Sequence, residues 1–176
     1  PAAVGGDVTV ENVIPKHLDC ITAKLREMGA RVTEFDDSIR VEADRRLRRS
    51  NVKTMPYPGF PTDAQPVLMA ALLRSEGCTV FVENIFENRY RHVDELSRMG
   101  AEIRVAGRVA VVNGVRTLHG AAVKCTDLRG GAALVIAGLS AEGTTRVTEL
   151  THIDRGYDAI ERDLAALGAQ IRRETT

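Results

Sequence analysis

The chain has 176 residues, of which 44% are hydrophobic, so it is long and apolar enough to fold as a single domain with a sizeable core. Its 24 basic and 24 acidic residues cancel, which argues against nucleic acid or an anionic membrane surface as a partner. No run of about 18 apolar residues occurs, so we predict no membrane-spanning segment and a cytoplasmic protein.

A phrase of the form Leu-x-x-x-Gly-Ala occurs three times, with its glycine at Gly29, Gly100 and Gly168. The copies are 71 and 68 residues apart. This spacing is longer than the roughly 20–50-residue units of common solenoids, so each unit should hold several elements. We therefore predict that residues 1–176 form one domain of three similar units, at about residues 6–76, 77–142 and 143–176.

Each predicted unit begins with a turn and a strand rich in β-branched residues. These strands are expected at residues 6–12, 77–84 and 143–149. An amphipathic helix follows, since apolar residues from Leu18 to Met28 recur on one helical face, and residues 157–167 repeat the stripe. The glycine of each Gly-Ala pair then ends the helix, because glycine adopts the left-handed conformation at little cost.

The remainder of each unit contains further strands and a second helix. Alternating polar and apolar residues predict hairpins at residues 31–42 and 102–112. Short strands at residues 51–54 and 121–125 lead into helices at residues 67–74 and 132–141. These two helices are apolar on nearly every face, so they must be buried on all sides.

Buried helices with half-polar strands around them predict a particular arrangement. The helices would lie on an inner axis and the sheets outside them. We therefore predict the α/β fold class and, within it, an inside-out α/β barrel of pseudo-threefold repeats. The third unit contains only its first strand, its helix and the start of a strand at residues 170–173. We therefore predict that the third repeat is incomplete.

Charged residues occupy matching positions in these units. Asp63 and Arg129 each lie 14 residues before the glycine that opens the next unit, Gly77 or Gly143, at the start of an apolar helix. An aspartate there is most simply an N-cap or first-turn residue of the helix. A cation there opposes the helix dipole, which favours an anion-binding role for Arg129.

Arg89 and Arg155 occupy equivalent loops, each between the first strand of a unit and its amphipathic helix. The planar guanidinium can hold phosphate or carboxylate with two parallel hydrogen bonds, so Arg89, Arg129 and Arg155 together would form an anion site. Each arginine alone would be an ordinary surface ion pair, with Glu87 or Asp154 as a partner.

Other reactive residue types point to no site. The three cysteines include no Cys-x-x-Cys pair, which argues against a disulfide framework or a zinc site, so we expect reduced, packed thiols. The four histidines lack metal-ligand spacing, so we expect no metal, and His92 is interpreted as a helix-surface or hydrogen-bonding residue. The basic run at residues 45–49 has no aromatic neighbours and is interpreted as a solvated loop.

Five phrases, in this order, resemble the enolpyruvyl transferase family and, within it, the UDP-N-acetylglucosamine 1-carboxyvinyltransferases. They are Phe-Pro-Thr-Asp at 60–63, Phe-Glu-Asn-Arg at 86–89, Leu-Ser-Arg-Met-Gly-Ala at 96–101, Thr-Asp-Leu-Arg at 126–129 and His-Ile-Asp-Arg-Gly-Tyr at 152–157. The resemblance runs along essentially the whole chain but covers only the C-terminal part of those enzymes. Since the chain also opens on Pro1 rather than Met, we expect a piece of a longer protein.

The resemblance implies one of two inside-out α/β domains, with substrates in the cleft between them. The missing N-terminal domain of the same enzyme would be its partner, and strands from that enzyme's N-terminus would complete the third repeat. The implied reaction transfers enolpyruvyl from phosphoenolpyruvate to the 3-hydroxyl of UDP-N-acetylglucosamine and releases phosphate, without a cofactor. This reaction is the first committed step of peptidoglycan synthesis.

The resemblance also implies residue roles. Asp63 would bind the sugar hydroxyl and act as the base, the Ile85 backbone would contact the sugar nucleotide, and Asp127 would position Arg129. Arg89, Arg129 and Arg155 would bind phosphoenolpyruvate and the tetrahedral intermediate, so the catalytic residues would be Asp63, Arg129 and Arg155. The family's loop with a reactive cysteine has no match among Cys20, Cys78 and Cys125, so the isolated chain is expected to be inactive.

Two alternatives remain open at this point. One is a shikimate-phosphate enolpyruvyl transferase, which shares the fold, although the phrases at 60–63 and 152–157 favour the amino-sugar enzyme. The other is a non-catalytic module that uses its arginines only to hold anions.

Overall fold

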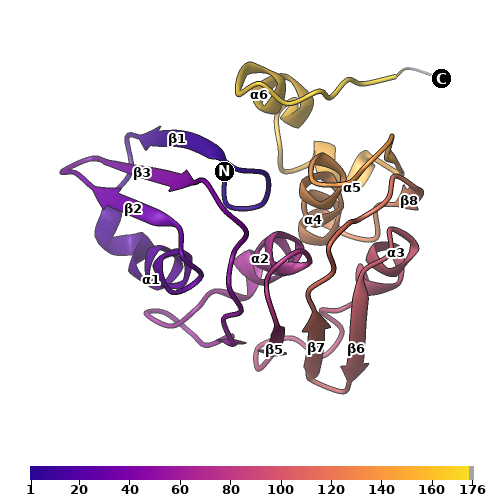
Figure 1. Ribbon diagram of the computed structural model, residues 1–176, viewed down its shortest axis with the longest axis horizontal. Coiled ribbons are helices and arrows are strands. Elements are labelled where there is room, and N and C mark those ends of the chain that lie inside the picture. Colours follow the sequence, from indigo (N-terminus) through magenta and orange to yellow (C-terminus); the bar gives the residue numbers. More distant parts are fainter. Residues whose placement is uncertain (175–176) are drawn as a thin grey trace.

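Within residues 1–174, three β-sheets follow one another along the sequence, and two apolar helices pack against each other at the centre (Figure 1). This computed structural model describes residues 1–174. The strand orders are β1-β3-β2, β4-β5-β7-β6 and β8-β9. The predicted α/β class is therefore confirmed, whereas the sheets of residues 1–174 do not close into a barrel.

The first sheet is an antiparallel hairpin joined by the opening strand. Its strands are β1 (Gly6–Glu11), β2 (Arg31–Glu34) and β3 (Ser38–Ala43), and η1 (Pro15–Leu18) with α1 (Asp19–Glu27) joins the first to the second. Gly29 follows α1 with a φ of +96°, as the predicted helix stop requires. Its counterparts Gly100 and Gly168 have φ values of +89° and +94°.

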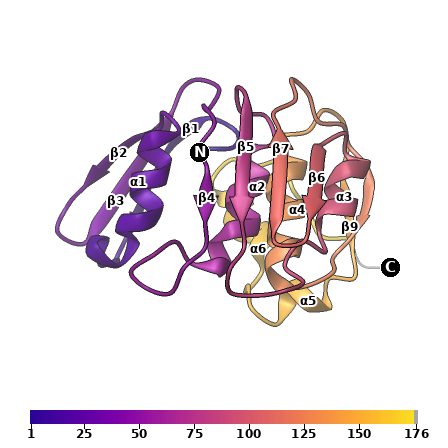
Figure 2. The ribbon, with the colours of Figure 1, turned by 90° about the horizontal axis from the view of Figure 1, so that it is seen from below.

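The second sheet stands in front of the central helices (Figure 2). It contains β4 (Val52–Lys53), β5 (Cys78–Val82), β6 (Glu102–Ala106) and β7 (Val109–Asn113), and α3 (Val93–Arg98) precedes β6. Alternate residues point inward, so Phe81, Ala110 and Val112 are fully buried. The predicted strands and hairpin of this unit are confirmed.

The third sheet has only two parallel strands, β8 (Ala122–Lys124) and β9 (Arg146–Thr148), followed by α5 (Thr151–Asp154) and α6 (Ile160–Ala166). The helix predicted over residues 157–167 starts late, because Ala159 takes a left-handed φ of +49°. The prediction of a strand from residue 170 is wrong. Residues 170–174 form no ladder, since a strand exists only where a neighbouring strand satisfies its backbone groups.

The predicted burial of the central helices is confirmed for most of their residues, although Val67, Ala71 and Ile136 are only partly buried. They are α2 (Gln65–Leu72), which follows η2 (Thr62–Ala64), and α4 (Leu128–Leu139). Their buried apolar residues include Leu68, Met69, Leu72, Ala133, Leu134 and Ala137. The removal of these side chains from water is the main force that keeps the sheets around this pair. α4 begins four residues earlier than predicted because Asp127 caps it.

The basic run at residues 45–49 is not simply a solvated loop, and Arg46 corrects that interpretation. Its guanidinium donates to the carbonyl oxygens of Arg74, Ser75 (3.0 Å), Gly114 (3.5 Å) and Val115 (2.8 Å). Arg74 and Ser75 lie in the turn that follows α2. Arg46 therefore ties this turn to the segment after β7.

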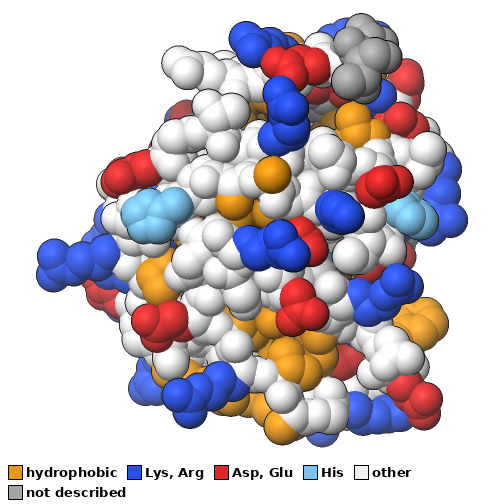
Figure 3. Space-filling view, turned by 90° about the vertical axis from the view of Figure 1, so that its right-hand side faces the viewer, with side chains coloured by type: hydrophobic (Ala, Val, Ile, Leu, Met, Phe, Trp, Pro, Cys, Tyr) orange, Lys and Arg blue, Asp and Glu red, His pale blue; other side chains and the backbone are white. Residues whose placement is uncertain are grey.

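The surface carries both signs of charge. On the face that Figure 3 shows, basic and acidic side chains are interspersed over α3, α5 and the third sheet. Of the helices in residues 1–174, none combines the length and the apolar character that a bilayer crossing needs.

Candidate active site

Of the charged residues predicted to be functional, Arg89 and Arg129 both bind the carboxylate of Asp63. Asp63 Oδ1 accepts a hydrogen bond from Arg89 Nη2 at 2.6 Å, and Asp63 Oδ2 accepts one from Arg129 Nη2 at 2.9 Å. The Asp63 side chain is 55% exposed, and those of Arg89 and Arg129 are 15% and 33% exposed. The Asp63 cluster, defined as Asp63, Arg89 and Arg129, therefore opens to solvent on its carboxylate side.

Local structure places Asp63 in the turn before α2. The extended Pro61 precedes η2, and the Thr62 hydroxyl donates to Glu83 Oε2 at 3.1 Å. Arg89 also donates from Nε and Nη2 to the Thr62 carbonyl at 3.3 and 3.0 Å. The Asp63 side chain accepts no capping bond from α2, so Asp63 is not an N-cap, but it does lie in the first turn of η2, as the other predicted role requires.

Asp127 holds Arg129 through the backbone. Its Oδ1 accepts from the backbone N–H groups of Arg129 at 3.0 Å and Gly130 at 2.8 Å, which is the hydrogen bonding of a helix N-cap. The Arg129 side chain then bridges two partners, because Nη2 reaches Asp63 and Nη1 donates to the Tyr157 hydroxyl at 3.3 Å. The cap therefore fixes where the Arg129 side chain starts.

The two arginines lower the pKa of the Asp63 carboxyl. Partial burial raises this pKa, but the hydrogen bonds and charges of Arg89 and Arg129 together outweigh burial, so the pKa lies below its ordinary value. The hydrogen bond to Tyr157 and the pairing with Asp63 raise the pKa of Arg129 above its ordinary value. At neutral pH the cluster is thus an ionised carboxylate between two guanidinium groups.

Glu83 is a buried carboxylate behind this cluster that sequence reasoning did not single out. It is 1% exposed and accepts from the Thr54 hydroxyl (2.9 Å), the Thr62 hydroxyl (3.1 Å) and the backbone N–H groups of Ile85 (2.8 Å) and Phe86 (3.1 Å). It therefore ties the Asp63 turn to the loop after β5. The sequence did contain a signal for this residue, because a glutamate recurs at the end of the first strand of each predicted unit, at Glu11, Glu83 and Glu149.

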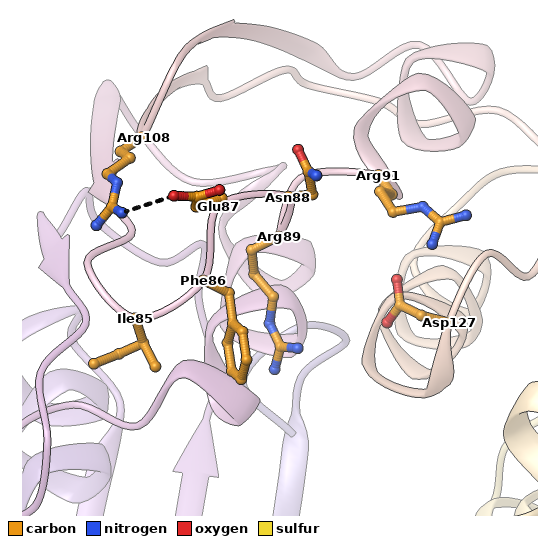
Figure 4. A pocket seen from close by; sticks show the side chains of 8 residues that line it. All are labelled: Ile85, Phe86, Glu87, Asn88, Arg89, Arg91, Arg108 and Asp127. Atoms are coloured by element: carbon orange, nitrogen blue, oxygen red, sulfur yellow. Dashed lines mark ion pairs between the residues drawn. The ribbon is translucent and has the colours of Figure 1, made fainter.

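The loop after β5 forms one wall of a hollow of about 570 Å³ (Figure 4). Ile85 and Phe86 are 37% and 52% exposed, and Arg89 Cζ lies 5.3 Å from the centre of the Phe86 ring, a cation–π distance. Glu87 pairs with Arg108 at 3.8 Å, not with Arg89. The hollow thus combines exposed apolar side chains with a guanidinium that also belongs to the Asp63 cluster.

Arg155 does not join the cluster. Its side chain is exposed and makes no ion pair or side-chain hydrogen bond with any residue of the described chain. The expected neighbour Asp154 instead pairs with Arg173 at 2.7 Å. The structure therefore assembles two of the three predicted arginines.

The interpretation of His92 as a surface or hydrogen-bonding residue is wrong. Its side chain is fully buried, and neither ring nitrogen has a hydrogen-bond partner within residues 1–174. Burial lowers the pKa of His92 to about 4, although the charge of Asp127 opposes this effect. A Cβ at Gly130 would lie only 2.9 Å from His92 Cβ, so His92 packs directly against the start of α4.

The cysteines are free thiols; Cys125 is buried, and Cys20 and Cys78 are half-buried. Burial raises the pKa of Cys125, whose Sγ donates to the Asp127 carbonyl at 3.2 Å. Across residues 1–174, no three His, Cys, Asp or Glu side chains gather closely enough to hold a metal ion.

Comparisons with known proteins agree on one family. The family model described as EPSP synthase (3-phosphoshikimate 1-carboxyvinyltransferase) matches residues 1–164. The UDP-N-acetylglucosamine 1-carboxyvinyltransferase of Desulfofundulus thermocisternus is 58% identical over 172 residues, which are 98% of this chain and 71% of that protein. The UDP-N-acetylglucosamine 1-carboxyvinyltransferase 3 of Caldanaerobacter subterraneus is 56% identical over 172 residues, which are 98% of this chain and 41% of that enzyme.

A solved structure extends the likeness to three dimensions. The crystal structure of the enolpyruvyl transferase NikO from Streptomyces tendae superposes with a TM-score of 0.87 and 29% identity. The match covers 97% of this chain and 41% of that one. The chain therefore spans well under half of NikO and of the Caldanaerobacter relative.

Proposed function

Because the chain belongs to the EPSP synthase family of enolpyruvyl transferases, we propose that it forms one wall of the active site of a UDP-N-acetylglucosamine 1-carboxyvinyltransferase. The observation that carries the proposal is the Asp63 cluster, in which a solvent-facing carboxylate lies between two guanidinium groups. A base next to two anion-binding groups is what the addition of a hydroxyl to a phosphorylated enol requires. The whole enzyme would act in peptidoglycan synthesis.

The proposed reaction has two steps. In the first, the sugar 3-hydroxyl gives its proton to Asp63 while its oxygen bonds to C2 of phosphoenolpyruvate, and C3 takes a proton from a general acid of the whole enzyme. In the second, phosphate leaves C2 with the proton held by Asp63, and C3 returns a proton to that general acid, which restores the double bond as an enolpyruvyl ether. Arg89 and Arg129 would bind the anionic groups of phosphoenolpyruvate and of the intermediate.

Arg155 would complete this anion site from the neighbouring loop. The Arg155 side chain makes no ion pair or side-chain hydrogen bond with the described residues. Arg155 could therefore bind an anionic ligand without first breaking such a contact. Ile85 would contact the sugar nucleotide through its backbone, and Glu83 supports this role because it holds the Ile85 N–H in place.

We propose that the completed domain is an inside-out α/β barrel of three repeats, at about residues 6–76, 77–142 and 143–176. The three sheets, which lie around α2 and α4, support this arrangement. The remaining, N-terminal domain of the enzyme would close the other side of the substrate cleft. Both proposed substrates are charged metabolites that do not cross membranes unaided, so we expect the reaction to take place in the cytoplasm.

The alternatives are less well supported. Relatives that are 56% and 58% identical over 98% of this chain carry the amino-sugar enzyme's name, which favours that substrate over shikimate phosphate. A purely anion-binding module would need the arginines but not a carboxylate between them. Asp63 therefore separates the catalytic proposal from the binding proposal.

A chimaera tests the proposal. The matching 172-residue segment of the Caldanaerobacter enzyme is replaced by this chain, and phosphate release from phosphoenolpyruvate is measured with UDP-N-acetylglucosamine or shikimate 3-phosphate as the acceptor. We expect turnover with the amino-sugar acceptor only. A folded chimaera that binds phosphoenolpyruvate but turns over neither acceptor would support the binding module instead.

A further inference from the structure

We propose that Tyr157 is a positioning residue that orients Arg129 for anion binding, an inference that rests on the proposed function of the Asp63 cluster. The Tyr157 hydroxyl accepts a hydrogen bond from Arg129 Nη1 at 3.3 Å, while Nη2 of the same guanidinium donates to Asp63 at 2.9 Å. Tyr157, Arg129 and Asp63 line one hollow of the molecule. The guanidinium is therefore held on one edge by a phenol and on the other by a carboxylate.

Tyr157 is itself firmly held. Its backbone N–H donates to the Ile153 carbonyl at 3.0 Å, and its ring packs on a small apolar cluster that contains Cys125, Val135 and Ile153. The preceding Gly156 lies so close to Leu128 that a Cβ there would meet Leu128 Cδ1 at 2.8 Å. The phenol is thus a fixed acceptor on the segment that packs against the first turn of α4.

Arg129 needs such an acceptor for two reasons. Its side chain is long and flexible, and it starts in the first turn of α4, where the helix dipole disfavours a cation. Its other partner, Asp63, has to be free to interact with the substrate hydroxyl during the proposed reaction. Once an anion takes the place of Asp63 at Nη2, the bond to Tyr157 is the side-chain contact that keeps Arg129 in position.

A phenol suits this task better than a second carboxylate would. A carboxylate at position 157 would neutralise the guanidinium and repel the incoming anion. The Tyr157 hydroxyl accepts one hydrogen bond without a formal charge, so the positive charge of Arg129 stays available to the ligand. The positioning role is therefore compatible with anion binding at the same guanidinium.

Substitution of Tyr157 by Phe tests the inference, because the ring and its packing remain and only the hydroxyl is lost. Tyr57→Phe is the matched control, since Tyr57 is 73% exposed. Side-chain NMR of the Arg129 guanidinium, thermal unfolding and titration with inorganic phosphate are measured on the full chain. In Tyr157→Phe we expect faster rotation of the guanidinium, an unchanged unfolding temperature and about fivefold weaker phosphate binding, the typical effect of one lost hydrogen bond.

The wild-type chain provides a test that needs no variant. The Arg129 Nη1 protons should exchange with water more slowly than those of Arg155, whose side chain is exposed. Equal exchange rates, or a guanidinium signal and phosphate affinity unaltered in Tyr157→Phe, would refute the role of Tyr157. If the wild type binds no phosphate while the guanidinium signals still respond to Tyr157→Phe, Tyr157 orients Arg129 and the proposed anion site is wrong.

Discussion

The Asp63 carboxylate and the Arg129 guanidinium lie 2.9 Å apart although 66 residues separate them in the chain. Both residues stand at the start of a central helix, α2 or α4, and these helices pack against each other. The repeat therefore does more than build a core. It places a carboxylate from one unit and a cation from the next within hydrogen-bonding distance.

The first prediction concerns catalysis. In the chimaeric enzyme, Asp63→Asn keeps the size of the side chain but removes its ability to take a proton. We expect kcat to fall by about a hundredfold or more, which is the contribution of a general base. Phosphate release is the measurement, and Asp36→Asn, in the exposed turn between β2 and β3, is the control. Unchanged kinetics in Asp63→Asn would remove Asp63 from the mechanism.

The second prediction couples anion binding to the basicity of Asp63. In the free chain the two arginines keep the Asp63 pKa below its ordinary value. Inorganic phosphate bound to these arginines would withdraw their hydrogen bonds and add negative charge, so both effects raise the pKa. NMR titration of the Asp63 carboxyl carbon, with and without phosphate, measures the change. A pKa that stays constant or falls with phosphate contradicts this coupling.

Much of the fold was predictable because the units repeat. The strand, helix and Gly-stop pattern recurs, so each copy supports the assignment of the others, and the hairpins and buried helices were confirmed. The strand expected after residue 169 failed for a physical reason. Its sequence favours an extended chain, but β-structure needs a pairing partner, and residues 1–174 provide none there.

The site was predictable only in part. Equivalent helix starts indicated Asp63 and Arg129, and equivalent loops indicated Arg89 and Arg155. The structure brings Arg89 and Arg129 to Asp63, whereas Arg155 stays apart. Glu83 could have been singled out by its counterparts Glu11 and Glu149, whereas the hydrogen bond between Arg129 and Tyr157 joins segments that no local pattern relates. The packing of His92 likewise depends on Gly130, whose lack of a side chain leaves room for His92 Cβ.

The third prediction tests whether Arg46 holds the turn after α2 against the segment after β7. Arg46→Ala removes the donor to four carbonyl groups, two of them directly after α2. We expect the free energy of unfolding to fall by about 2 kcal/mol, as for hydrogen bonds to a charged group. Urea denaturation measures it. Arg45→Ala is the control, because Arg45 is 71% exposed and, within residues 1–174, forms an ion pair only with the adjacent Asp44, at 3.6 Å. Equal effects of the two substitutions would show that Arg46 is an ordinary surface residue.

The fourth prediction concerns the buried carboxylate of Glu83. Glu83→Ala leaves two hydroxyls and two backbone N–H groups without their acceptor, so we expect a loss of about 3 kcal/mol of unfolding free energy. Hydrogen exchange of the Ile85 and Phe86 amides should accelerate as well. Glu87→Ala, at an 85% exposed side chain, is the control and should change neither quantity. Protected Ile85 and Phe86 amides in Glu83→Ala would contradict the assignment.

The last prediction follows from the buried imidazole of His92. Its pKa is about 4 in the folded chain and about 6.5 when unfolded, so between these values the unfolded chain binds more protons. The contribution of the neutral His92 to the free energy of unfolding is therefore fully present above pH 6.5 and is lost as the pH falls towards 4. The loss attributable to His92 should approach about 3 kcal/mol.

Urea denaturation across this pH range measures the effect against two variants. His92→Leu removes the titrating group but keeps an apolar side chain in the buried space, so its stability should vary less with pH than that of the wild type. His17→Leu, at an exposed position, should keep the wild-type slope. Carboxylates titrate in all three proteins, so the difference between slopes isolates His92. Parallel slopes for the wild type and His92→Leu would mean that the imidazole accepts its proton without unfolding the chain.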